Sequence, residues 1–139
     1  MTQEDKMLLI KDLCARLPYG VKMNHIADDE HSPKTLIGVA KDMITLEGLG
    51  GYECVDTEDY KPYLFPLSSM TEEQQKEANI FDDMDMDILS ENLGRNHRNK
   101  TNIPTATYNY IDWLNKNHFD YRGLIPKGLA LDATGLNVY

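Results

Sequence analysis

The sequence predicts an α+β fold, and three patterns along the chain support this assignment. An amphipathic stretch covers residues 3–17, four short apolar segments with brief turns occupy residues 20–56, and two helical segments with start signals follow. Short strands separated by turns are typical of an antiparallel meander, which must curl or pack on a helix to be stable. We therefore expect an N-terminal helix, a small curled antiparallel sheet, two further helices and a short C-terminal strand.

The first helix is predicted from its cap and its apolar spacing. Thr2 can cap it, with Asp5 three residues on, and Pro18 disfavours helical geometry at the residue before it. The face expected to be buried recurs at three- and four-residue steps and comprises Met7, Ile10, Leu13, Cys14 and Leu17.

The next segments are predicted as strands near residues 21–25, 35–40, 43–46 and 52–55, and an SH3-like partial barrel is the specific architecture we expect. Residues 61–67 follow, with two prolines that bracket aromatic and aliphatic side chains. This composition predicts an extended connector that packs on the domain.

The second half begins with Thr71-Glu72-Glu73-Gln74, a capping box that predicts a helix to about Ile80. Residues 82–104 are acidic and then basic with few apolar side chains, which predicts a mobile loop. A helix is expected from Pro104-Thr105 to Lys116, with Tyr108, Ile111 and Leu114 facing inward. The tail from residue 113 should close a single domain, 1–139, against the sheet.

Composition limits the function classes. The 139 residues carry a formal net charge of −9, and such a surface repels phosphate backbones, so direct nucleic-acid binding is not expected. Cys14 and Cys54 lie far apart and are expected to be reduced, with Cys14 packed in the core. The polar N-terminus and the absence of a long apolar stretch predict a cytoplasmic protein without a membrane span.

No motif predicts a metal or cofactor. Asp83, Asp85 and Asp87 resemble the start of a calcium loop, but Ile88 and Gly94 occupy the positions that need glycine and glutamate. The histidines show no paired spacing for zinc; His25, His31 and His97 are expected at the surface, and the fourth is His118. Nucleophile elbows and phosphate-binding loops are absent, so no catalytic residue is assigned.

The candidate interaction surface lies where ionisable and aromatic side chains are densest, at Trp113, His118, Asp120, Tyr121 and Arg122. Arginine and tyrosine are enriched at binding hot spots, and Arg122 could pair with Asp120 or with a carboxylate of a partner. The alternative, which we prefer, is a structural corner in which Arg122 tethers two segments while aromatic side chains fill the core.

Three stretches, Lys61–Glu73, Trp113–Leu131 and Met1–Val21, resemble an uncharacterised family of small proteins from gut bacteria and their phages and mobile elements. The resemblance covers a little under half of the chain. It implies a bacterial or phage origin and a cytoplasmic location, and it carries no established activity.

Three functional hypotheses remain open. The first is a non-enzymatic accessory protein that binds a protein partner, which the acidic surface and the missing catalytic motifs favour. The second is a small hydrolase or metal-dependent enzyme that uses His118, Asp120 and Arg122. The third is an acidic nucleic-acid mimic built on the aspartate-rich segment.

Overall fold

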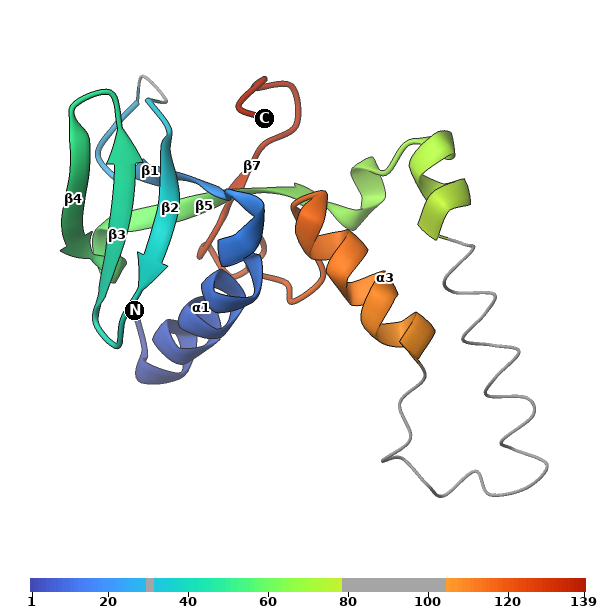
Figure 1. The fold of residues 1–139 in the computed structure, drawn as a ribbon, viewed down its shortest axis with the longest axis horizontal. Helices are drawn as coiled ribbons and strands as arrows, with labels where there is room; N and C mark the ends of the chain where they lie inside the picture. Colours follow the sequence, from blue (N-terminus) through green and yellow to red (C-terminus); the bar gives the residue numbers. More distant parts are fainter. Residues whose placement is uncertain (30–31, 79–104) are drawn as a thin grey trace. The chain divides into compact units, whose positions relative to one another are not determined.

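A curled, open sheet forms the centre of the larger of two compact units in this computed structural model (Figure 1). The structure describes residues 1–29, 32–78 and 105–139. The first unit comprises Met1–Ser69 and His118–Tyr139, and the second comprises Met70–Asn117. The predicted mobile loop 82–104 lies outside the described residues, as do His31 and His97.

The first unit opens with helix α1 (Gln3–Arg16), close to the predicted bounds. The Thr2 hydroxyl accepts a hydrogen bond of 3.1 Å from the backbone N–H of Asp5, so the predicted cap is confirmed. A short 3₁₀ turn, Leu17–Tyr19, follows the helix, and Gly20 adopts a left-handed conformation with φ of 66°. That backbone geometry favours glycine and redirects the chain into the sheet.

The predicted buried face of α1 is wrong at Met7 and Cys14, whereas Leu13 is fully buried and Leu17 packs against the core as predicted. The buried side chains are Leu9, Asp12, Leu13 and Arg16, whereas Met7 is 63% exposed and Cys14 is exposed. The predicted and the observed buried residues both recur at helical spacing, so spacing alone does not distinguish them. The ion pair between Asp12 and Arg16 allows these two charged residues to share the buried face with Leu9 and Leu13. Cys14 is therefore not a core residue, contrary to the prediction.

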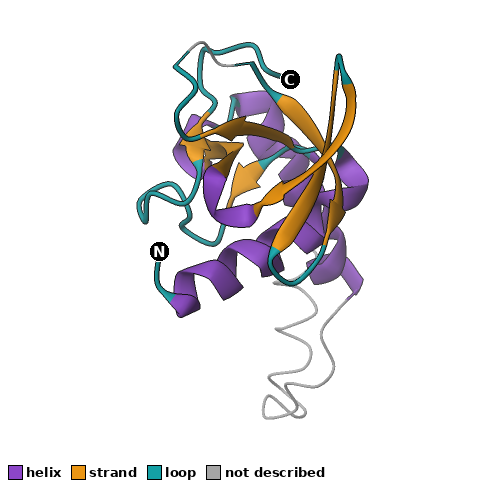
Figure 2. Ribbon diagram, turned by 90° about the vertical axis from the view of Figure 1, so that its left-hand side faces the viewer, coloured by secondary structure: helices purple, strands orange, loops and turns teal. Residues whose placement is uncertain are grey.

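The four predicted meander strands are confirmed as β1 (Lys22–His25), β2 (Lys34–Val39), β3 (Met43–Gly48) and β4 (Gly51–Asp56). Each pairs antiparallel with the next, and an irregularity in register falls between Leu36 and Gly38. The sheet is curled and open, and α1 lies against one of its faces (Figure 2). The finer expectation of an SH3-like closure stays a prediction.

Residues 61–67 are predicted to be an extended connector that packs on the domain. The packing is confirmed, since Tyr63 and Leu64 are fully buried, but residues 61–66 belong to a paired strand, β5 (Tyr60–Pro66), and Leu67 begins the 3₁₀ turn that follows it. β5 pairs antiparallel with β1 through Tyr60–Pro62, while parallel pairing with other segments begins only at Tyr63. Among the described residues, Pro62 therefore has a paired strand on one side only. A proline, which lacks an N–H, is tolerated at such a position as it is at the edge of a sheet. The short 3₁₀ turns Thr57–Asp59 and Leu67–Ser69 flank β5.

The C-terminal segment closes this unit. Both β6 (Phe119–Asp120) and β7 (Leu131–Asp132) pair parallel with β5, at Phe65–Pro66 and Tyr63–Leu64 respectively. The segment between them contributes Leu124, Leu129 and Ala130 to the core. The other members of that core come from α1, from the sheet and from the residue directly before β1, and they are Leu9, Leu13, Val21, Met23, Leu36, Ile44, Leu46, Tyr60 and Leu64.

The second unit contains the predicted capping box. The Thr71 N–H donates to Gln74 Oε1 at 2.9 Å, the Gln74 N–H donates to Thr71 Oγ1 at 3.1 Å, and residues 72–78 are helical. Helix α3 (Thr105–Lys116) confirms the second predicted helix. Leu114 is buried as expected, but Tyr108 is 56% exposed, so its predicted inward orientation is wrong.

Candidate functional site

The five residues of the predicted interaction surface are distributed over both units. Trp113 belongs to α3 in the second unit, where its indole N–H donates to Glu77 Oε2 at 3.1 Å. His118, Asp120, Tyr121 and Arg122 belong to the first unit.

His118 is a buried turn residue. Its backbone has a φ of 63°, and its carbonyl accepts a hydrogen bond from the Phe65 N–H at 2.8 Å. Its imidazole stacks on Tyr139 with ring centres 3.7 Å apart and an interplanar angle of 12°. Burial, with a further contribution from the nearby Arg16 and Lys22 cations, lowers the pKa of His118 from 6.5 to about 4. The ring is therefore neutral at pH 7.

Asp120 braces the turn that follows β6. Its Oδ1 accepts the N–H of Leu124 and its Oδ2 accepts the N–H of Ile125, both at 2.9 Å. The carboxylate is buried, and two backbone donors satisfy it. This arrangement fixes the segment that delivers Leu124 into the core.

Arg122 pairs with Asp12 of α1 and with no other carboxylate among the described residues. Arg122 Nε lies 3.2 Å from Asp12 Oδ1, and Arg16 Nε lies 2.7 Å from Asp12 Oδ2. Arg16 also donates to the Phe119 carbonyl at 2.6 Å, and both guanidinium groups lie over the Tyr121 ring, at 5.4 Å for Arg16 and 4.9 Å for Arg122. Asp12, Arg16, Tyr121 and Arg122 thus join α1 to the C-terminal segment.

Sequence reasoning missed Asp12 and Arg16, the two fully buried members of this charged cluster. Their four-residue spacing is the signal that could have identified them, because it places opposite charges on one helical face beside Leu9 and Leu13. The cluster serves to tether segments, since its carboxylate and its cations are engaged with one another.

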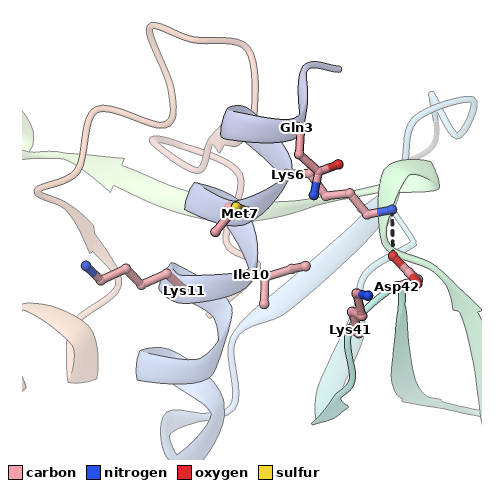
Figure 3. A pocket seen from close by; sticks show the side chains of 7 residues that line it. All are labelled: Gln3, Lys6, Met7, Ile10, Lys11, Lys41 and Asp42. Atoms are coloured by element: carbon pink, nitrogen blue, oxygen red, sulfur yellow. Dashed lines mark ion pairs between the residues drawn. The ribbon is translucent and has the colours of Figure 1, made fainter.

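A second candidate site is a groove of about 330 Å³ between α1 and the bend that joins β2 to β3 (Figure 3). Its lining combines apolar and basic side chains and comprises Gln3, Lys6, Met7, Ile10, Lys11, Lys41 and Asp42. Met7 and Ile10 form its apolar part, and Lys11 and Lys41 lie on opposite sides of them in Figure 3.

The charges in this groove are unequally neutralised. The Lys6 ammonium lies 3.1 Å from Asp42 and 3.8 Å from Glu58, and the bond to Asp42 raises the pKa of Lys6. Within the part of the chain that the structure describes, Lys11 and Lys41 have no carboxylate partner. Sequence analysis assigned Met7 and Ile10 to the core and gave the lysines no role, because the sequence does not reveal which helix face the sheet covers.

The described residues also limit other functions. Among residues 1–29, 32–78 and 105–139, no group of histidine, cysteine, aspartate or glutamate side chains is arranged to hold a metal ion. None of the helices in these ranges has the length and apolar character needed to cross a bilayer.

No protein-family model, curated protein or solved structure matches this chain. The resemblance to small proteins of gut bacteria and phages therefore stays an expectation.

Proposed function

We propose that this protein is a non-enzymatic interaction module that binds a protein partner through the groove between α1 and the β2–β3 bend. One observation carries the proposal: α1 has two apolar stripes, and the stripe with Met7 and Ile10 is left facing a groove while Leu9 and Leu13 fill the core. An apolar centre with a charged rim is the usual composition of a protein-binding surface.

The hydrolase alternative finds less support in the geometry. General acid–base catalysis needs a group that can exchange a proton with a bound substrate. Both oxygens of Asp120 accept backbone N–H groups, and Arg122 pairs with Asp12. The nucleic-acid mimic depends on acidic residues between 82 and 104, which lie outside the described residues.

A photo-crosslinking amino acid at position 7 tests the proposal in the full-length chain. Expressed in its native cell, the protein should form an adduct with a defined protein from position 7 but not from Tyr52, which is 73% exposed on β4. The adduct should disappear in the K11E/K41E variant and persist in K76E/K127E, which reverses two exposed charges outside the groove. An adduct that survives K11E/K41E, or the absence of any adduct at position 7, would refute the assignment of this groove.

The remaining expectations extend this proposal. We infer a cytoplasmic accessory role in a bacterium, phage or mobile element. The sequence resemblance supports the origin and the location, and the acidic composition supports the accessory role.

A further inference from the structure

We infer that the groove selects an acidic peptide segment whose carboxylates flank apolar side chains; this inference rests on the proposed function above. The groove is basic although the chain as a whole has a formal net charge of −9. Three of its seven lining residues are lysines and one is an aspartate, so its own side chains carry a net positive charge. Charge complementarity therefore favours an anionic occupant.

The arrangement of the lysines defines where that negative charge should lie. Lys6 is already neutralised by Asp42 and Glu58, which leaves Lys11 and Lys41 as the available cations on the two sides of the apolar centre. A ligand with one carboxylate at each side and an apolar side chain between them would satisfy both (Figure 3). The aliphatic stems of the lysines would extend the apolar contact.

The dimensions of the groove suit a short stretch of peptide. Its lining runs along α1 from Gln3 to Lys11, which corresponds to roughly 12 Å of helix axis at 1.5 Å per residue. An extended peptide covers that distance with about four residues. Met7 is a flexible, polarisable side chain that adapts to different apolar partners, as methionine does at other peptide-binding surfaces.

A polyanionic nucleic acid fits this groove less well. Single-stranded nucleic acids gain much of their affinity by stacking bases on aromatic rings, and the seven lining residues include none. The acidic surface of the whole chain would also oppose a long phosphate backbone. We therefore commit to a peptide, and nucleic acid becomes an outcome of the test.

The test uses the full-length chain and fluorescent synthetic probes. The probes are a peptide of alternating glutamate and leucine, a glutamate–glycine peptide of equal charge, a lysine–leucine peptide and a single-stranded oligonucleotide. Fluorescence anisotropy should show binding of the glutamate–leucine peptide, with at least tenfold weaker binding of the other three. K11E/K41E should weaken that binding about tenfold and gain affinity for the lysine–leucine peptide, whereas K76E/K127E should leave both unchanged.

Each other outcome overturns the inference in a distinct way. Equal binding of the glutamate–glycine peptide would show that the groove does not require apolar side chains in its ligand. Preferential binding of the oligonucleotide would show that the ligand is a nucleic acid and not a peptide. A dimer in analytical ultracentrifugation that K11E/K41E dissociates would make a second copy the occupant. If no acidic peptide binds while position 7 still crosslinks to a protein in a lysine-dependent manner, the peptide chemistry is wrong and the interaction function survives.

Discussion

Asp12 and Arg16 show how single residues can reverse the expected burial of a helix. Neither side chain is accessible to solvent, and the pair is held at 2.7 Å with Arg122 on the other side of the carboxylate. A buried ion pair adds little stability compared with apolar residues, but removal of one partner leaves an uncompensated charge. The pair therefore acts mainly by fixing how α1 and the C-terminal segment meet.

Arg16→Leu should lower the free energy of unfolding by about 3–5 kcal/mol, because Asp12 would lose its closest cation while remaining buried. Chemical denaturation measures this loss. The double variant D12L/R16L should recover part of it, since no buried carboxylate remains. Lys11→Leu is the matched control on the exposed side of α1 and should change stability by less than about 0.5 kcal/mol. A loss below about 1 kcal/mol for Arg16→Leu would contradict this role.

His118 should make the fold sensitive to mild acid. Its pKa is about 4 in the folded protein and 6.5 in the unfolded chain, so the unfolded state binds the proton first as pH falls. The stabilising effect of a neutral His118 is complete above pH 6.5 and decreases from there to pH 4. The full loss of stability over this range is roughly 3–4 kcal/mol, since the two pKa values differ by about 2.5 and one pKa unit corresponds to about 1.4 kcal/mol.

His118→Asn isolates this effect, because asparagine does not titrate in this range and tolerates the left-handed backbone. Urea denaturation at several pH values between 7 and 4 should show a shallower loss of stability for this variant than for the wild type. Parallel curves for the two proteins would show that His118 does not bind its proton differently in the two states.

At the scale of elements, the N-terminal cap of α1 gives a local prediction. Thr2→Ala removes the hydroxyl that accepts the Asp5 N–H, and it should destabilise the protein by about 0.5–2 kcal/mol. Thr2→Asp should retain most of the stability, because a carboxylate also caps and favours the positive helix end. Thermal or chemical unfolding measures both variants, and equal stability of Thr2→Ala and wild type would exclude a contribution from the cap.

The elements differ in how clearly their sequences specify them. Thr71 and Gln74 form both hydrogen bonds of a capping box, so a local motif was sufficient there. β5 was not recognised, because Pro62 and Pro66 argue against a strand and only the arrangement of the neighbouring segments makes them acceptable. Likewise, two stripes of α1 share helical spacing, and the sheet determines which one is covered.

At the scale of the whole molecule, the C-terminal segment should be essential for folding of the first unit. It provides β6, β7 and the core residues Leu124, Leu129 and Ala130. The Tyr139 hydroxyl also accepts the Lys22 N–H at 2.9 Å and donates to the Tyr63 carbonyl at 2.7 Å, thereby linking β1 to β5. Desolvation of this hydroxyl raises the pKa of Tyr139, although the residue as a whole is 42% exposed, and the phenol stays protonated at neutral pH.

Deletion of residues 129–139 should abolish the cooperative thermal transition, as it removes β7, two core side chains and the Tyr139 bonds. Circular dichroism on heating provides the measurement. Leu136→Ser, a change at a side chain that is 39% exposed, should preserve the transition. A truncated chain that melts like the full-length protein would contradict the closing role of this segment.

The sequence by itself determined the α+β class, the meander strands, the caps at Thr2 and Thr71 and the segments that become α1 and α3. These features depend on neighbours within a few residues, where hydrogen-bonding and spacing rules apply directly. Only the tertiary structure decided that Arg16 is buried, that residues 60–66 form a strand, and that Met7 and Ile10 face a groove. Those outcomes depend on contacts between distant segments, such as the 103 residues that separate Arg16 from the Phe119 carbonyl it contacts.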